Sequence, residues 1–285
     1  MSNFVRTMRQ EVIPSALVWL SFAVVAGVFA LVVGDLLWHG AGNLSFSFLT
    51  AAPESAGRAG GIGPILVSTI LILAICMGAT IPIGIGTAIL LAEFTSRSSR
   101  FGRSIRVSLD VLAGVPSIVF GLFGNALFCK VLGFGFSIVS GGLTLACMAL
   151  PLFIRSVEEG FRQVPQDYRS SAAALGLSRT STLRHILIPA AAPGIVVGLI
   201  LGVGRALAET AALIFTSGYV DRLPESLWDS GRALSVHIFD LSMNVPGGDA
   251  NAYKAAFVLV VFLLMINGFV ELLSARLLSR RIVTT

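Results

Sequence analysis

Charged residues are scarce in this chain of 285 residues. Lys, Arg, Asp and Glu together make up 12% of the sequence, against roughly 25% in a typical soluble domain. Hydrophobic residues supply 55%, and they are gathered into runs long enough to cross a bilayer, which takes about 20 residues. The composition excludes an ordinary soluble domain and indicates a membrane protein.

The motifs of common hydrolases and ATPases are also missing. No H-E-x-x-H, G-x-S-x-G or Walker-type G-x-x-x-x-G-K-[ST] pattern is present. The histidines and cysteines are few and lack metal-ligand spacing or a disulfide framework. They are His39, His185, His237, Cys76, Cys129 and Cys147. A membrane enzyme is therefore disfavoured, no cofactor is predicted, and any ATP hydrolysis must come from a partner.

Six apolar runs are predicted to be membrane-spanning helices, because backbone polar groups in lipid must be satisfied within the segment. The runs cover about 15–37, 64–92, 107–132, 134–154, 187–215 and 255–277. The first run exceeds the apolar part of a signal peptide, about 7–15 residues, so an uncleaved span is favoured. We therefore predict an all-α membrane protein with one transmembrane domain over 1–285 and a cytoplasmic loop over about 155–186.

Positive charge sets the predicted orientation, because Lys and Arg accumulate in cytoplasmic loops. With the N-terminus inside, most of the 20 Lys and Arg residues fall on the inner side. These are Arg6, Arg9, Arg97, Arg100, Arg103, Arg106, Arg155, Arg162, Arg169, Arg179, Arg184, Arg276, Arg280 and Arg281. Both termini are then cytoplasmic. The basic residues are spread over four segments without an aromatic platform, so nucleic-acid binding is not expected.

The outer connections 38–63 and 217–254 are long in this topology. The second contains Trp228, His237 and the turn-forming V-P-G-G-D, which suits either contact with an external partner or a solvated connection. Gly and Pro interrupt the second and third runs. Such residues are tolerated in membrane helices that pack against neighbours or line a cavity, which favours a transporter bundle over a simple anchor.

A long polar segment follows the fourth apolar run and is predicted to form a helix–turn–helix at the cytoplasmic surface. Pro165 suits a first helical turn, Gly176 the residue just past a helix end, and Ser178 the N-cap of the next helix. Pro189 interrupts the chain where it re-enters the membrane. The small surface of Ala172–Leu175 suits docking into a protein groove better than insertion into lipid as an amphipathic helix.

These residues resemble the cytoplasmic motif of ABC importer permeases, which reads EAA, three residues, Gly, nine residues, then Ile-x-Leu-Pro. Gly176, Ile186, Ile188 and Pro189 stand at the matching spacing. Ser170-Ser171-Ala172 replaces EAA itself, so the acidic residue is missing. The resemblance implies a type I ABC importer permease fold with six transmembrane helices, whose short coupling helix docks in a cleft of the ATPase.

A narrower resemblance, to the PstA-like permeases of Pst-type phosphate importers, rests on four segments. They read GGIGPILVSTI at 60–70, AGVPSIVFGLFG at 113–124, LPLFIRSVEEGFRQVP at 150–165 and GRALAETAALIFTSG at 204–218. The resemblance implies a bacterial inner-membrane complex. Its other members are a PstC-like permease in a heterodimer, two PstB-like ATPases and an extracytoplasmic PstS-like phosphate-binding protein.

Arg205 and Glu209 lie inside the fifth apolar run, where a charge is costly and seldom accidental. On a continuous helix both would share a face with Gly194, Gly198 and Gly202, and at i and i+4 they would be in reach of each other. Because a guanidinium matches phosphate oxygens in a bidentate way, the pair is predicted to line the anion pathway. A structural ion pair between helices is the alternative.

Arg155 is a further pathway candidate by the family resemblance, although a positive residue is expected at an inner membrane boundary in any case. Other functions stay open. Sulfate, molybdate and phosphonate are alternatives for the anion, because composition does not separate them from phosphate. An ion-coupled secondary transporter is less favoured because the sequence shows no internal repeat. A signalling role alongside transport is compatible with the family.

Overall fold

A computed structural model describes residues 2–42, 44–96 and 98–282, without side chains for 2–14, 16 and 273–282. The residues Arg6, Arg9, Arg97, Arg276, Arg280 and Arg281, used above to predict the orientation, therefore lie outside the described side chains. Apart from one small hairpin, the described chain folds into helices and turns. The predicted all-α class is confirmed.

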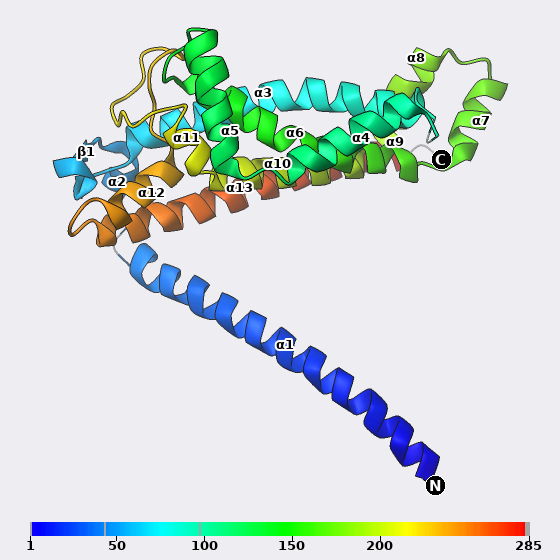
Figure 1. Cartoon of the computed structure of the whole chain (residues 1–285), viewed down its shortest axis with the longest axis horizontal. Coiled ribbons are helices and arrows are strands. Elements are labelled where there is room, and N and C mark those ends of the chain that lie inside the picture. Colours follow the sequence, from blue (N-terminus) through cyan, green and yellow to red (C-terminus); the bar gives the residue numbers. More distant parts are fainter. Residues whose placement is uncertain (1, 43, 97, 283–285) are drawn as a thin grey trace.

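The helices run along one elongated bundle, with one helix diverging from it (Figure 1). Strands β1 (Pro53–Glu54) and β2 (Ala59–Gly60) pair antiparallel across the turn η1 (Ser55–Gly57). The remaining elements are α1 (Ser2–Ala41), α2 (Phe46–Thr50), α3 (Gly63–Glu93), α4 (Arg100–Ala113), α5 (Ser117–Gly124), η2 (Asn125–Val131), α6 (Ile138–Gln163), α7 (Gln166–Ala174), α8 (Arg179–Thr182), η3 (Leu183–Leu187), α9 (Ile188–Ala190), α10 (Ala192–Ala208), α11 (Ala211–Ile214), α12 (Leu234–Met243) and α13 (Asp249–Ile282).

Four helices in the described part are long and apolar enough to cross a membrane: parts of α1 and α13, and all of α3 and α6. Two bent pairs of helices also qualify. The first joins Arg100–Ala113 to Ser117–Val131 at 103°, and the second joins Arg179–Ala190 to Ala192–Ala208 at 63°. Counting each bent pair as one span gives six, the number that the sequence predicts.

The predicted ranges differ from the helices at the two bends. The range 107–132 is not one helix, because α4 ends before Gly114 and Pro116 starts a new direction with its fixed φ of −60°. The range 187–215 is broken at Ala191, and α10 ends at Ala208. Apolarity over a window reports the surroundings of a segment but not whether its backbone is continuous.

Helix α6 continues beyond the predicted membrane boundary. It begins after the N-cap Ser137 and extends to Gln163, so residues 155–163 are helical rather than the start of the cytoplasmic loop. The first polar residues at its end, from Arg155 onward, are compatible with a helix. A charged residue marks a change of surroundings rather than the end of a helix.

The core lies where α6 packs against α3 and α10. Phe153, Val157 and Phe161 of α6 are fully buried beside Leu91 of α3. Helices α6 and α10 approach closely through glycine: a Cβ placed on Gly160 would lie 2.8 Å from the Cα of Gly194. Such small residues allow helices to pack backbone to backbone. Gly198 of α10 likewise lies against α6, since its Cβ would meet Phe153 at 3.0 Å and Ser156 at 3.3 Å.

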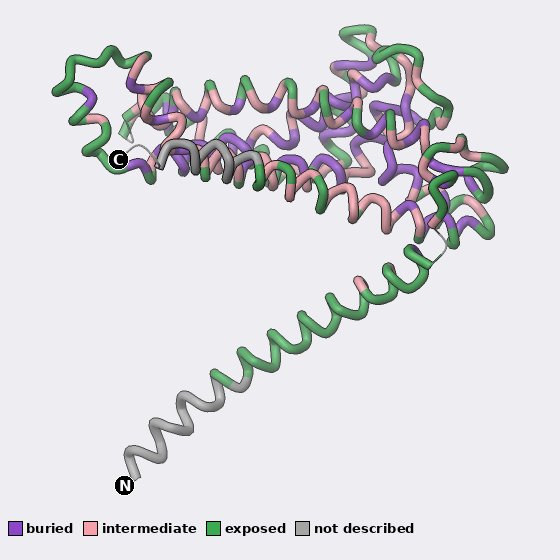
Figure 2. Tube along the Cα trace, turned by 180° about the vertical axis from the view of Figure 1, so that it is seen from behind, coloured by how far each residue is buried: buried purple, intermediate pink, exposed green. Residues whose placement is uncertain are grey.

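Helix α1 diverges from the bundle (Figures 1 and 2). An apolar window of 18 residues within Leu17–Ala41 has no residue buried by the described chain. Its last turns contact α13, where the Tyr253 hydroxyl donates to Asp35 at 2.9 Å and the rings of His39 and Tyr253 lie 5.1 Å apart. The apolar face of α1 is left for lipid or another chain to cover.

We expect Gly194→Ala to lower the thermal midpoint of the purified protein in detergent, because its Cβ would meet the backbone of Gly160. The expected decrease in the free energy of unfolding is about 1–3 kcal/mol, which is typical of overpacking. Gly204→Ala on the same helix is the control, since its Cβ would meet only Leu263 Cδ1 at 3.9 Å. Equal midpoints for the two variants would contradict the close contact of α6 and α10.

Candidate functional site

A helical hairpin projects at one end of the bundle and contains the EAA-like residues. It comprises α7, α8 and η3, at the end opposite to the β1–β2 hairpin and α12 (Figure 1). The predicted helix–turn–helix is therefore present. Pro165 is the N-cap of α7, one position before the first helical turn in which the sequence places it.

Local chemistry explains the turn between α7 and α8. Gly176 has φ +70°, a left-handed conformation that glycine adopts without strain. The N–H of Leu177 donates to the C=O of Ala172, and that of Gly176 to Ala173, which satisfies carbonyls at the end of α7. The Ser178 side chain accepts from the N–H of Ser181 at 3.2 Å and caps α8. Both predicted helix-end roles are confirmed.

The EAA-like residues divide between two faces. Ser170, Ser171 and Gly176 are exposed, whereas Ala172 is buried, so Ala172 does not belong to the predicted docking surface. Its neighbours Ala173, Ala174 and Leu175 are exposed. The later motif residues Ile186, Ile188 and Pro189 are partly buried, and the two isoleucines pack against the core cluster of α6. The exposed face of α7 is thus small and smooth, and the end of the motif attaches to the bundle.

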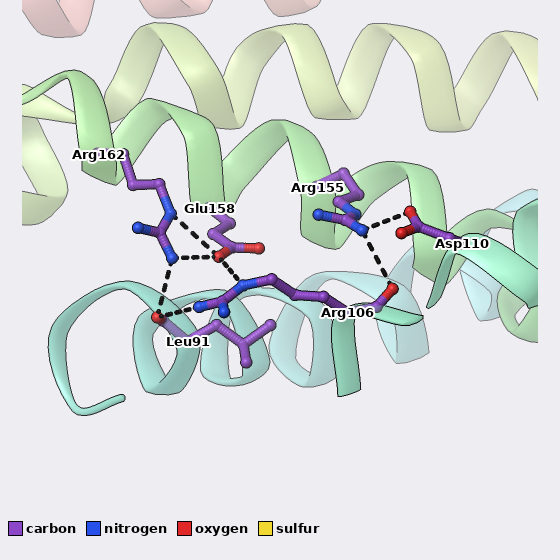
Figure 3. Close-up of polar contacts among 6 residues, drawn as sticks. All are labelled: Leu91, Arg106, Asp110, Arg155, Glu158 and Arg162. Carbon is purple, nitrogen blue, oxygen red and sulfur yellow. Dashed lines mark hydrogen bonds and ion pairs between the residues drawn. The ribbon is translucent and has the colours of Figure 1, made fainter. Parts of the chain in front are cut away.

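Three charged side chains meet where the last turns of α3 and α6 lie against α4 (Figure 3). The carboxylate of Glu158 is 4% exposed and accepts at Oε1 from Arg106 Nε at 2.9 Å and from Arg162 Nη2 at 2.6 Å. Both guanidinium groups also donate to the carbonyl of Leu91, at 3.2 and 3.4 Å. A buried carboxylate requires such partners, so these contacts hold the three helices together. Sequence reasoning did not single out Glu158.

Arg155 lies beside this cluster. It donates to the carbonyl of Arg106 at 3.1 Å and pairs with Asp110 of α4 (Figure 3). With Arg106, Arg162, Glu158 and Glu159 it lines a cavity of about 290 Å³. Its side chain is 37% exposed, which leaves part of the guanidinium accessible from the cavity.

Arg205 and Glu209 do not form the predicted contact. Arg205 is exposed in the last turn of α10 and makes no hydrogen bond or ion pair within the described chain. Glu209 has left the helix, with φ −80° and ψ 127°, and its carboxylate accepts from the N–H of Ala212 at the start of α11. The prediction of an i, i+4 pair is wrong because it assumes a continuous helix. Arg205 is left free for another partner.

The loop 217–254 contains a partly buried polar network around the buried His237. Arg232 donates to the carbonyl of Tyr219 at 2.8 Å. It also forms ion pairs with Asp240 at 3.3 Å and with Asp221 at 4.0 Å. Its Nη1 lies 3.4 Å from Nδ1 of His237. Burial and the positive charge of Arg232 outweigh the two carboxylates and lower the pKa of His237 from 6.5 to about 4. His237 therefore stabilises the loop from inside and is not on its surface.

Trp228 is the exposed aromatic residue of this loop that the sequence singled out. Its side chain is 57% exposed, and its ring packs edge-on against Phe134 at 5.0 Å. The loop thus presents an aromatic side chain on a surface held by the partly buried ion pairs of Arg232.

An elongated bundle with broken helices and a projecting helical hairpin is the architecture expected of a permease of the binding-protein-dependent class. A family model described as "binding-protein-dependent transport system inner membrane component" matches residues 81–284, and the chain belongs to this family. It is a permease subunit of an ABC transporter and not itself an enzyme. Permeases of this class work with an ATPase and a substrate-binding protein.

Curated relatives cover most of the chain. A probable ABC transporter permease of Bacillus subtilis, YqgI, is 33% identical over 263 residues, 87% of this chain and 89% of its own. The phosphate transport system permease protein PstA 2 of Mycobacterium bovis is 33% identical over 247 residues, which cover 83% of this chain and 81% of that protein. The predicted family resemblance is confirmed.

Solved structures support the fold. A bacterial ABC transporter involved in the import of the acidic polysaccharide alginate aligns with a TM-score of 0.61 at 16% identity, over 94% of this chain and 96% of that one. A chain of an inward-facing MetNI methionine ABC transporter aligns with a TM-score of 0.56 at 17% identity, over 76% of this chain and 95% of that one. The predicted type I ABC importer permease fold is confirmed.

The buried His237 predicts a pH-dependent loss of stability. An unfolded histidine binds a proton below about pH 6.5, but His237 in the fold does so only near 4, so stability present at neutral pH is lost as the pH falls between these values. At pH 5 the expected loss is about 2 kcal/mol. Thermal unfolding of the wild type and of His237→Gln at pH 7.5 and 5.0 measures it.

The variant should lose less stability between the two pH values than the wild type. His185→Gln is the control because this histidine is exposed at the opposite end of the bundle. A wild-type pH dependence that survives in His237→Gln would show that another group is responsible.

Proposed function

We propose that this chain is a permease subunit of an ATP-driven phosphate importer, in which it forms half of the translocation pathway. The observation that carries the proposal is the likeness, over more than 80% of the chain, to relatives named as phosphate transport permeases of the PstA type. The exposed guanidinium of Arg205 adds the chemistry that an oxyanion pathway needs. Sulfate, molybdate and phosphonate permeases remain the alternatives.

The arrangement of the ends supports the proposed orientation. Hairpin α7–α8 lies at one end of the bundle, and the loops 38–63 and 217–254 lie at the other (Figure 1). With the arginine-rich end in the cytoplasm, both termini are cytoplasmic and the long loops face outward. The smooth face of α7 then docks an ATPase inside, and the outer loops are available to a binding protein.

Four partners follow from this proposal. A PstC-like permease pairs with this chain, two PstB-like ATPases bind below, and a PstS-like protein delivers phosphate from outside. The complex lies in the bacterial inner membrane. The exposed α1 and the exposed Arg205 are both surfaces that a second permease covers in such a heterodimer.

In the proposed pathway Arg205 acts alone, and not as an ion pair with Glu209. Glu209 caps α11 instead of neutralising Arg205, so the guanidinium offers its full charge and five donors to an anion. It stands in the last turn of α10, the helix that follows the coupling hairpin along the chain. Movement of the hairpin therefore changes the position of this charge through α9 and α10. Arg155 lines the inner cavity and is proposed as a second contact on the way out.

We expect Arg205→Gln to reduce phosphate uptake by at least about tenfold while leaving the complex assembled, because glutamine lacks the charged fork. Uptake of labelled inorganic phosphate by cells expressing the complete complex measures the effect. Phosphate uptake by the wild-type complex should persist in excess sulfate. Inhibition by sulfate would indicate that the importer transports sulfate or a related anion instead of phosphate.

Arg222→Gln is the matched control. Arg222 is also an exposed arginine of this chain but lies in the outer loop, and its removal should leave uptake within about twofold of the wild type. Near-normal uptake by Arg205→Gln in an assembled complex would remove Arg205 from the pathway.

The docking role of α7 is tested at Gly176. Gly176→Val places a β-branched residue at φ +70°, which costs about 1–2 kcal/mol locally and distorts the turn beside the docking face. Co-purification of the ATPase and phosphate uptake should both fall. Gly247→Val is the control, because Gly247 has φ +77° and equally open surroundings at the outer end. Loss of ATPase binding by both variants would indicate general destabilisation instead.

A further inference from the structure

Helix α7 has little apolar attachment to the bundle. Among its residues only Ala172 is buried. Its covalent link to α6 passes through Val164 and Pro165, which are both extended and therefore do not continue either helix. A short helix joined in this way changes its angle easily unless polar contacts hold it. Those contacts determine which helices follow when α7 moves.

One side chain provides most of these contacts. The guanidinium of Arg169, on α7, donates to both carboxylate oxygens of Glu93, at 3.0 Å from Nε and 2.5 Å from Nη2. It also donates to the carbonyls of Val164 at 2.8 Å and Phe161 at 3.0 Å, at the end of α6. The two side chains are 21% and 13% exposed. The pair thus joins α7 to the ends of both α3 and α6.

Glu93 is well placed to transmit force, because it is the last residue of α3. Two residues earlier, the carbonyl of Leu91 receives the guanidinium groups of Arg106 and Arg162, which also hold the buried Glu158 (Figure 3). The end of α3 is therefore attached to α4 and α6 as well as to α7. Helix α3 continues from this end along the length of the bundle to Gly63, beside the outer hairpin (Figure 1).

The hairpin has three connections to the transmembrane helices. Its chain continues from α6 through Val164 and Pro165 at one end, and through η3 and α9 into α10, which carries Arg205, at the other. The pair Arg169–Glu93 adds a connection to α3, the one of the three helices that no adjacent chain segment joins to the hairpin. With the two chain connections alone, movement of the hairpin would act on α6 and α10 but not directly on α3. With the ion pair in place, α3 is moved as well.

We propose that the Arg169–Glu93 pair is the connection that transmits movement of the coupling helix to α3, and that without it ATP hydrolysis proceeds uncoupled from transport. This proposal rests on the proposed function, in which α7 docks the ATPase. Glu93 and Arg169 are positioning residues, because neither touches the transported anion or ATP. The bidentate geometry matters, since a fork of two parallel N–H donors fixes the orientation of α7 relative to α3, which a single contact does not.

The test uses the complete importer in proteoliposomes, with its partner permease, its ATPase and its binding protein. Labelled inorganic phosphate uptake and ATP hydrolysis are measured together for the wild type, Glu93→Gln, and the exchanged double variant Glu93→Arg with Arg169→Glu. We expect Glu93→Gln to assemble and hydrolyse ATP, with phosphate transported per ATP reduced about fivefold or more, the range of an appreciable coupling between sites. The exchanged pair should recover part of this ratio.

Glu271→Gln is the matched control. Glu271 is an exposed acidic residue of α13 that makes no hydrogen bond or ion pair with another described residue. Its ratio of phosphate to ATP should equal that of the wild type. A purely stabilising role for the pair would lower assembly or the thermal midpoint in proportion to uptake and leave this ratio unchanged.

The outcomes separate the two proposals. An unchanged ratio in Glu93→Gln, with wild-type phosphate transport intact, would overturn the transmitting role of the pair and leave the phosphate importer in place. Absence of phosphate transport by the wild-type complex would overturn the proposed function instead. Should Glu93→Gln fail to assemble, the exchanged variant decides: assembly with no recovery of the ratio contradicts the proposal.

Discussion

Close packing of α6 against α3 and α10 is the constraint on which the rest of the structure depends. In α6, 67% of the apolar window is buried within this chain, against none in α1 and 6% in α13. The contact is made by small residues: Gly142 meets Ile75 of α3, and Gly160 meets Gly194 of α10. Lipid gives apolar side chains little reason to associate, so the close approach of backbones provides much of the stabilisation.

This packing determines where charge is tolerated. Near the C-terminal end of α6, Glu158 is buried and two arginines pair with it, because an unpaired carboxylate there would be strongly destabilising. The resulting cluster fastens the last turns of α3 and α6 to α4. Arg169 extends it to the coupling helix. Charge that is paired inside the chain thus organises the end at which we propose the ATPase binds.

Arg205 shows the opposite arrangement. The glycine face of α10 contacts α6 and α3 as far as Gly202, whose nearest neighbour is Met77. One turn later, Arg205 has no hydrogen-bond or ion-pair partner among the described residues. A charge without an internal partner at the end of a membrane helix is expensive unless water, an anion or a second subunit accompanies it. The same helix therefore combines tight packing at one end with a free cation at the other.

Local signals predicted the coupling hairpin well, because each depends on residues close in sequence. Ser178 caps α8 and Gly176 adopts the left-handed turn after α7, as their chemistry requires. Six apolar runs and the EAA-like spacing were likewise enough to predict the class and the fold. Apolarity did not reveal that the chain leaves the helix at Glu209, since Ala211–Ile214 are as apolar as α10 but start a separate turn. The composition of the loop likewise did not reveal that His237 is buried.

The roles of the charged residues depend on contacts between distant segments. Arg106 and Glu158 are 52 residues apart in sequence, and Glu93 and Arg169 are 76 apart. The spacing of residues along the sequence cannot predict such pairs, because it depends only on the local backbone conformation. Length, apolarity and turn residues were therefore sufficient for the helices and their ends. Which arginines are paired, and that Arg205 is not paired within the described chain, followed from how α3, α6 and α10 pack in three dimensions.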